Sequence, residues 1–177
     1  MKNLFKRYKT AILMIIILLM MTLIVPTKGQ VATSMTIKNI IEMIKIIPPI
    51  FILLGLLDVW VPREQMIKYM GDGSGILGVI IAFLLGSVAA GPLYAAFPVA
   101  GVLLKKGSKF SNILIFIGAW STTKIPLLLM EGQSLGWKFT ITRLIINIFG
   151  IILIARITDK ALNDSEKEEI YNLSENI

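Results

Sequence analysis

Residues 74–104 read SGILGVIIAFLLGSVAAGPLYAAFPVAGVLL and contain no charged side chain. At about 31 residues, the stretch is longer than the roughly 20 residues that cross a bilayer as one helix. Its middle, Gly86–Pro92, combines small residues with a Gly-Pro pair, and Pro98 follows. Proline interrupts the hydrogen-bond ladder of a helix, and small residues let helices pack closely. We therefore predict two short apolar helices that flank a break.

A break of this kind points to a transport site. Irregular backbone at membrane depth is tolerated only where it packs inside protein or lines a cavity. Interrupted helices also form the substrate sites of many transporters. The candidate substrate-binding residues of this break are Gly91, Pro92, Tyr94 and Pro98. Tyr94 would line or gate a pocket, or else serve only as an aromatic packing residue.

The composition defines the class of protein. Of the 177 residues, 55% are hydrophobic, which predicts an all-α polytopic membrane protein whose residues 1–177 form a single membrane domain. The chain has no cysteine and no histidine, which removes metal sites built on them, disulfides, thiolate nucleophiles and Ser-His catalysis. We therefore expect no cofactor, no metal site and no enzymatic activity.

The net charge of +7 comes from basic residues that flank the apolar runs. This placement is typical of the cytoplasmic ends of membrane spans. No aromatic-basic surface of the kind that binds nucleic acid accompanies this charge, so we expect the bilayer, and no nucleic acid, as its partner. The residues concerned are Lys2, Lys6, Arg7 and Lys9 before the first apolar run, and Lys105, Lys106 and Lys109 after the broken stretch.

Residues 1–45 predict an N-terminal helix followed by an amphipathic linker. The uncharged run Thr10–Val25 fits either an uncleaved first transmembrane helix or a signal peptide. Lys28–Lys45 carries isoleucines at helical spacing, and it leads into the second span, Ile46–Val61, as an interfacial turn or as a continuous helix. Asp58 in that span is either a buried proton or cation site or an interfacial acid near the helix end.

A second polar cluster lies in the middle of the predicted span Phe110–Met130. A lysine at this depth is unfavourable by about 2.5–3.5 kcal/mol on insertion scales. Pro126 removes a backbone hydrogen bond and so frees a carbonyl one turn earlier. We predict a second unwound segment here, although Lys124 could instead snorkel toward the interface near Glu131. The candidate substrate-binding residues of this segment are Ser121, Thr122, Thr123, Lys124 and Pro126.

The glycines of residues 73–78 match the G-x-G-x-x-G pattern of dinucleotide-binding proteins. That pattern needs a strand before it and a βαβ unit around it, and neither is predicted here. We interpret these glycines as a tight turn followed by close helix packing.

The loop charges favour one topology. If residues 74–104 enter the membrane and return as a re-entrant pair, every basic loop stays inside, which gives about four transmembrane helices plus a broken, re-entrant helix pair. Five spans, with inverted dimers, are the alternative. The last span, Phe139–Ile157, holds Arg143, which either snorkels outward or pairs with Glu131 or Asp58. Residues 46–157 would form the permease core and residues 158–177 a polar cytoplasmic tail able to form a helix.

Three stretches resemble a family of predicted permeases that includes organoarsenical efflux permeases of the ArsP type. They are PPIFILLGLLDVWVPREQMIKYMG, GSVAAGPLYAAFPVAGVLLKKG and GAWSTTKIPLLLMEGQSLGWKFTITRLI, and the resemblance covers roughly residues 46–155. It places Gly91, Pro92 and Pro98 in the family's broken segment. Family members usually carry two such units, so the resemblance implies a homodimer or a second half-permease. The Cys-Ser-Cys-type run of the arsenical members is replaced here by residues 94–97, YAAF, without a thiol for trivalent arsenic.

These observations predict a permease that moves a small solute or ion across the cell membrane, in which it is a multi-pass protein. The resemblance adds efflux as the direction and a homodimer of half-size units as the assembly. The alternative is a non-transporting membrane subunit that scaffolds or regulates another membrane complex. In that case the small-residue breaks would be helix-packing surfaces only.

Overall fold

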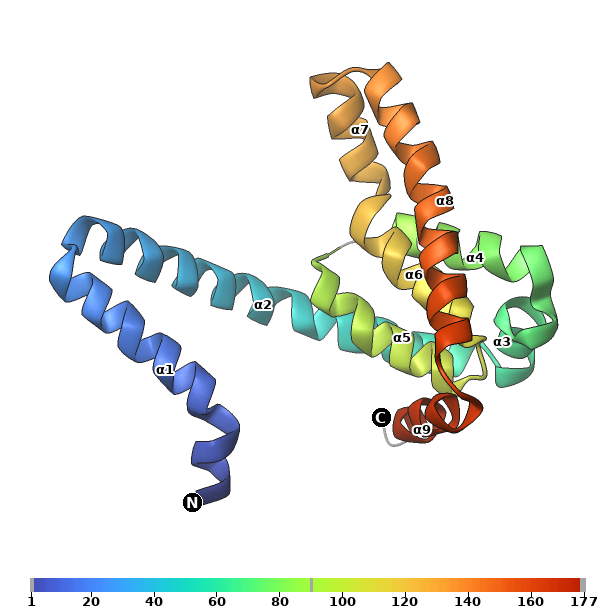
Figure 1. The fold of residues 1–177 in the computed structure, drawn as a ribbon, viewed down its shortest axis with the longest axis horizontal. Coiled ribbons are helices and arrows are strands. Elements are labelled where there is room, and N and C mark those ends of the chain that lie inside the picture. The colour runs from blue at the N-terminus through green and yellow to red at the C-terminus, as the bar shows by residue number, and fades with distance from the viewer. Residues whose placement is uncertain (1, 90, 176–177) are drawn as a thin grey trace. The chain divides into compact units, whose positions relative to one another are not determined.

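The computed structural model describes residues 2–89 and 91–175, without the side chains of residues 2–7, 54, 57 and 58. Over this part the chain is helical and contains no strand (Figure 1). The helices are α1 (Lys2–Ile24), α2 (Pro26–Trp60), α3 (Arg63–Met70), α4 (Gly75–Val88), α5 (Ala96–Lys105), α6 (Phe110–Thr122), α7 (Ile125–Ser134), α8 (Trp137–Ala161) and α9 (Asp164–Glu175), with the short 3₁₀ turns η1 (Asp72–Ser74) and η2 (Leu93–Ala95).

The chain divides into two compact units, residues 1–49 and residues 50–177. In the first unit, α1 turns sharply into α2 through hydrogen bonds from Val25 N to Met21 O and from Gly29 N to Val25 O, both 2.9 Å. A Cβ at Gly29 would lie 2.2 Å from the Cα of Thr22. Glycine is therefore the residue that lets the two helices approach at this turn.

Helix α2 continues without interruption through Pro48 and Pro49. Of the two sequence-based alternatives for the linker, the continuous helix is confirmed. The division between the two units follows Pro49 directly, where the two prolines remove successive backbone donors from the helix. The predicted role of Asp58 concerns a side chain outside the described residues.

Two helical segments of the described chain are long and apolar enough to cross a membrane. They are Phe110–Ser134, which comprises α6 and α7, and Trp137–Ala161, which is α8. A third becomes possible if α3 and the segment Asp72–Val88, which are bent by 46° at their junction, form one span. The apolar helices Tyr8–Ile24 and Leu93–Lys105 are shorter.

Helices α4 and α6 run side by side, and glycines set their separation. A Cβ at Gly86 would lie 2.4 Å from the carbonyl oxygen of Phe116, and one at Gly78 would lie 2.5 Å from Nδ2 of Asn112. Gly75, at the start of α4, has φ +52°. The interpretation of residues 73–78 as a turn and a packing surface is therefore confirmed in the described structure.

The segment from α4 to α5 starts and ends at the same end of α6. Lys109 N, just before α6, donates to Met70 O at 2.7 Å, and Asn112 Nδ2 donates to the same oxygen at 2.9 Å. Asn112 Nδ2 also lies 3.2 Å from Ser74 Oγ, before α4. The chain therefore leaves this end along α4, reverses between α4 and α5, and returns to it along α5.

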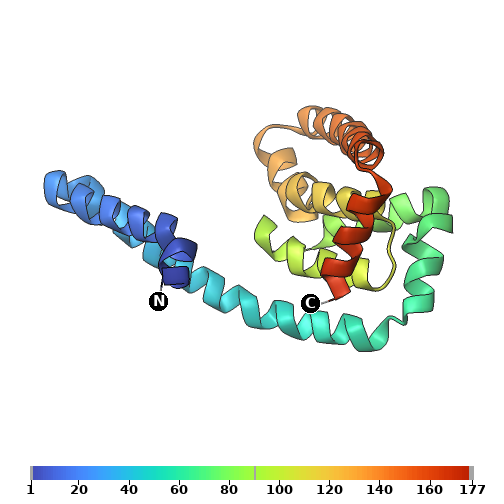
Figure 2. The same ribbon diagram turned by 60° about the horizontal axis from the view of Figure 1, so that its bottom comes forward.

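Helix α9 packs against α5 and against the connection between α5 and α6 (Figure 2). The Tyr171 hydroxyl donates to Ser108 O at 2.9 Å, and Lys167 lies 3.2 Å from Asp159 at the end of α8. Ser108 itself is fully buried. The polar C-terminal tail is thus helical, as the sequence allowed, and is docked onto the second unit.

Candidate functional site

The first helix break separates α4 from η2 and α5. Ala89 and Pro92 have extended backbone, with ψ of 139° and 162°. Gly91 has φ +112°, which is strained for any residue with a side chain. The Gly-Pro pair of the sequence therefore acts as predicted, because Gly91 reverses the chain and Pro92 starts the next helical turn in an extended conformation.

The second break separates α6 from α7 at Thr123 and Lys124, whose ψ angles of 27° and 133° are not helical. Pro126 lies in the first turn of α7, where a missing N–H is tolerated. Four residues earlier, Thr122 O accepts a hydrogen bond of 3.1 Å from Nη1 of Arg143 on α8. The prediction that Pro126 frees a carbonyl one turn earlier is confirmed, and a cationic side chain binds that carbonyl.

The two breaks meet at the carbonyl of Gly91. This oxygen accepts hydrogen bonds from Nζ of Lys124 and from Nε1 of Trp120, the latter at 3.3 Å. One turn before the first break, Ser87 Oγ lies 3.0 Å from the hydroxyl of Thr123, which is fully buried. The structure therefore brings Gly91, Lys124 and Thr123 together in one polar cluster between apolar helices.

An ion pair adjoins the second break. Arg143 Nε donates to Oε2 of Glu131 at 2.7 Å, and Nη2 lies 2.5 Å from the same oxygen. The side chains of Arg143 and Glu131 are only 23% and 14% exposed. Of the alternatives for Arg143, pairing with Glu131 is the one observed. Lys124 reaches Gly91 instead of snorkelling toward Glu131.

The side chains of the other predicted residues lie around this cluster without joining its hydrogen bonds. Tyr94 in η2 and Pro126 are exposed, and Pro98 is half-buried in the first turn of α5. The hydroxyls of Ser121 and Thr122 both bond back to Gly118 O at 2.9 Å, along their own helix. Pro92 shapes the backbone of the first break.

Four residues of the cluster were not among the predicted site residues: Ser87, Trp120, Glu131 and Arg143. Trp120 lies in the predicted polar segment and Ser87 in the predicted break. Their positions in the sequence could therefore have identified them as site residues. For Glu131 and Arg143, the signal was charge within apolar helices.

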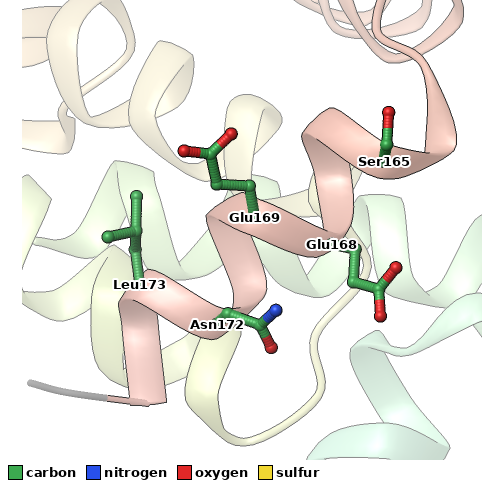
Figure 3. A pocket seen from close by; sticks show the side chains of 5 residues that line it. All are labelled: Ser165, Glu168, Glu169, Asn172 and Leu173. Carbon is green, nitrogen blue, oxygen red and sulfur yellow. The ribbon is translucent and has the colours of Figure 1, made fainter.

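A surface pocket lies on α9 and includes no residue of the two breaks. Its lining residues are Ser165, Glu168, Glu169, Asn172 and Leu173 (Figure 3). They all come from one helix, and Figure 3 shows Glu168 and Glu169 pointing away from each other. Over the described residues, no group of three His, Cys, Asp or Glu side chains could hold a metal ion.

Apolar helices of membrane-spanning length, two of them carrying buried charge beside paired helix breaks, define a helical membrane protein of the transport class. The chain belongs to the ArsP_1 family of predicted permeases, whose family model matches residues 29–176. The family resemblance predicted from the sequence is thereby confirmed. Neither the search of curated proteins nor the search of solved structures gave a match.

Proposed function

We propose that the two breaks form the substrate site of a permease that moves a small anionic or polar solute across the cell membrane. The observation that carries this proposal is the convergence of two donors, Lys124 Nζ and Trp120 Nε1, on the carbonyl of Gly91. An oxygen atom of a bound solute can replace that carbonyl and accept from the same donors. The candidate set keeps Gly91, Pro92, Tyr94, Pro98, Ser121, Thr122, Thr123, Lys124 and Pro126, with Trp120 added.

The charge of the site favours an anion over a cation. Lys124 and Arg143 each contribute a positive charge and Glu131 a negative one, which leaves one positive charge beside the breaks. Helices α5 and α7 both begin at a break, and the N-terminal end of a helix carries partial positive charge. The side-chain charge and the two helix N-termini therefore both favour an anion, and their effect is larger in a poorly hydrated site.

The α4–α5 segment would enter the membrane and return without crossing it. Helix α4 has 14 residues, or about 21 Å, which is shorter than the roughly 30 Å hydrocarbon core. The start of α4 and the end of α5 lie close together, because Met70, before α4, is hydrogen-bonded to Lys109, after α5. Gly91, between the two helices, lies beside the middle of the segment Phe110–Ser134. This arrangement supports the re-entrant pair in a multi-pass protein over five spans.

Two copies of the chain would assemble into the working permease. The resemblance implies two such units, and α8 exposes large apolar side chains that fit either lipid or a second copy. If the chain only scaffolds another complex, Gly78 and Gly86 serve packing alone and the purified protein moves no solute.

Flux through the purified protein in liposomes tests this proposal. The probes are radiolabelled inorganic phosphate, methanesulfonate and nitrate, with choline as a cation for comparison, all measured as exchange at equal pH. Lys124→Met should abolish anion exchange, whereas Lys160→Met, which removes an exposed lysine of α8, should leave it unchanged. Exchange that persists in Lys124→Met contradicts the site, and wild-type protein that exchanges no probe favours the scaffold alternative.

A further inference from the structure

The ion pair between Glu131 and Arg143 joins α7 to α8, and it also contacts the second helix break through Arg143. Glu131 lies in the last turn of α7 and Arg143 in the second turn of α8, close to the connection between the two segments of membrane-spanning length. Ionisable groups within such segments often mark the pathways of ions or protons. The substrate site proposed above uses the positive charge of Arg143 and assigns no task to the carboxylate.

Arg143 of the ion pair makes contact with the acid and with the second break through one side chain. Both close contacts of Arg143 go to one oxygen, Oε2, through Nε and Nη2. The third nitrogen, Nη1, donates to Thr122 O at the second break. One guanidinium therefore connects the acid with the backbone next to the proposed substrate site.

We propose that Glu131 is the proton-binding residue of a proton-coupled anion permease, a proposal that rests on the function proposed above. A proton from the aqueous phase adds to the Glu131 carboxylate and forms the neutral acid. Arg143 then lacks its counterion, and the anionic substrate takes the place of the carboxylate. Release of both reverses the two steps, so one monoanion moves with one proton.

The charge balance supports this coupling. Before binding, Glu131 and Arg143 sum to zero. With the acid protonated and a monoanion on Arg143, the sum is again zero. The pair of side chains is therefore neutral both before and after binding, which avoids an additional charge in a low-dielectric environment, where such a charge is most costly.

The other charged groups on the packed helices are engaged elsewhere or exposed. Arg143 is the charged side chain of α8 that faces Glu131, and Lys124 is bonded to Gly91 O. Asp159 pairs with Lys167 of α9. The remaining charged residues of α8 are exposed: Lys138, Arg156 and Lys160.

Transport under a pH gradient tests the proposal. Liposomes with purified protein, the three anion probes and an internal pH dye are first assayed for exchange at equal pH, and then for accumulation under an imposed gradient. Wild-type protein should accumulate a transported probe several-fold and move protons with it. Glu131→Gln should lose the gradient-driven accumulation and the accompanying proton movement, and Glu131→Asp should restore both. The matched control is Glu64→Gln, an exposed acid on α3.

The outcomes separate this proposal from the one before it. Gradient-driven accumulation that persists in folded Glu131→Gln overturns the proton site while leaving the substrate site intact. If wild-type protein exchanges no probe, the proposed function itself fails. The infrared band of the protonated carboxyl group then tests the proton site without any substrate. A band that grows on acidification and is absent from Glu131→Gln supports a titrating Glu131, and a band unchanged by that substitution overturns it.

Discussion

Both helix breaks free a backbone carbonyl, but the side chains that bind the two carbonyls differ. Each carbonyl accepts a hydrogen bond from a cationic side chain of another part of the fold. Gly91 O receives Lys124 together with the indole of Trp120. Thr122 O receives Arg143, which is already paired with Glu131.

The difference lies in the counterion. No carboxylate among the described residues pairs with Lys124, whose ammonium group is bonded to Gly91 O. The charge of Arg143 is compensated by Glu131. Under the two proposals above, the first break would be a permanent anion-binding element, and the second would be switched by protonation.

The largest effect on this comparison should come from separating α4 and α6. Gly86→Leu places a side chain where even a Cβ would lie 2.4 Å from Phe116 O and 2.9 Å from Trp120 N. Backbone cannot yield to such an overlap, so we expect loss of the folded protein from detergent extracts by size-exclusion chromatography. Gly55→Leu is the control, because a Cβ there meets nothing within 4 Å. Normal yield of Gly86→Leu would show that the breaks meet without this packing.

The next largest effect should distinguish the two cations. Arg143→Met leaves the largely buried Glu131 without a counterion and should destabilise the protein by about 3 kcal/mol. Lys124→Met leaves no acid without a counterion, and Trp120 still donates to Gly91 O. We therefore expect a loss of about 1 kcal/mol in unfolding free energy. Thermal melting in detergent measures both.

The double variant Glu131→Gln/Arg143→Met sharpens this difference. Removing both partners leaves no unpaired charge, so most of the stability lost in Arg143→Met should return. Equal costs for Lys124→Met and Arg143→Met, with no recovery in the double variant, would mean that the counterion does not distinguish the breaks.

A smaller effect should follow from the hydroxyl pair beside the first break. Thr123→Val removes the 3.0 Å contact with Ser87 and the 3.0 Å bond to Ala119 O at nearly constant volume. We expect a loss of about 1 kcal/mol in unfolding free energy. Thr142→Val removes an equivalent bond to Lys138 O at an exposed position and should change stability less. Equal losses in the two variants would argue against a structural role for the Ser87–Thr123 contact.

The smallest effect should come from the docked tail. Burial, followed by the nearby charge of Asp72, raises the pKa of Tyr171 above its usual value of 10.0. The neutral phenol is the form that the fold favours, so its contribution is complete below pH 10 and declines as pH rises through the raised pKa. Tyr171→Phe removes the bond to Ser108 O, at about 0.5–1 kcal/mol. It should also flatten the alkaline end of the stability profile, which melting from neutral to alkaline pH measures.

The sequence predicted the elements of this site better than their pairing. The Gly-Pro break and the carbonyl freed by Pro126 could be predicted, because glycine and proline act on the backbone close to their own position in the chain. The contact between Lys124 and Gly91 joins segments that lie 33 positions apart, and helical periodicity carries no information on such pairings. Arg143 had three alternatives for the same reason, because charge in an apolar helix indicates that a partner exists without naming it.

The docked helix α9 must share one membrane face with the connection between α5 and α6. The bond between Tyr171 and Ser108 O holds the C-terminal helix against this lysine-rich connection, residues 105–109. A label on the tail therefore reports the face of that connection, and a cysteine at exposed Lys105 must give the same answer. The buried Ser108 is unsuited to this purpose. Since both segments share one face, the acidic residues of α9 offset the positive charge that this face presents to anionic lipid headgroups.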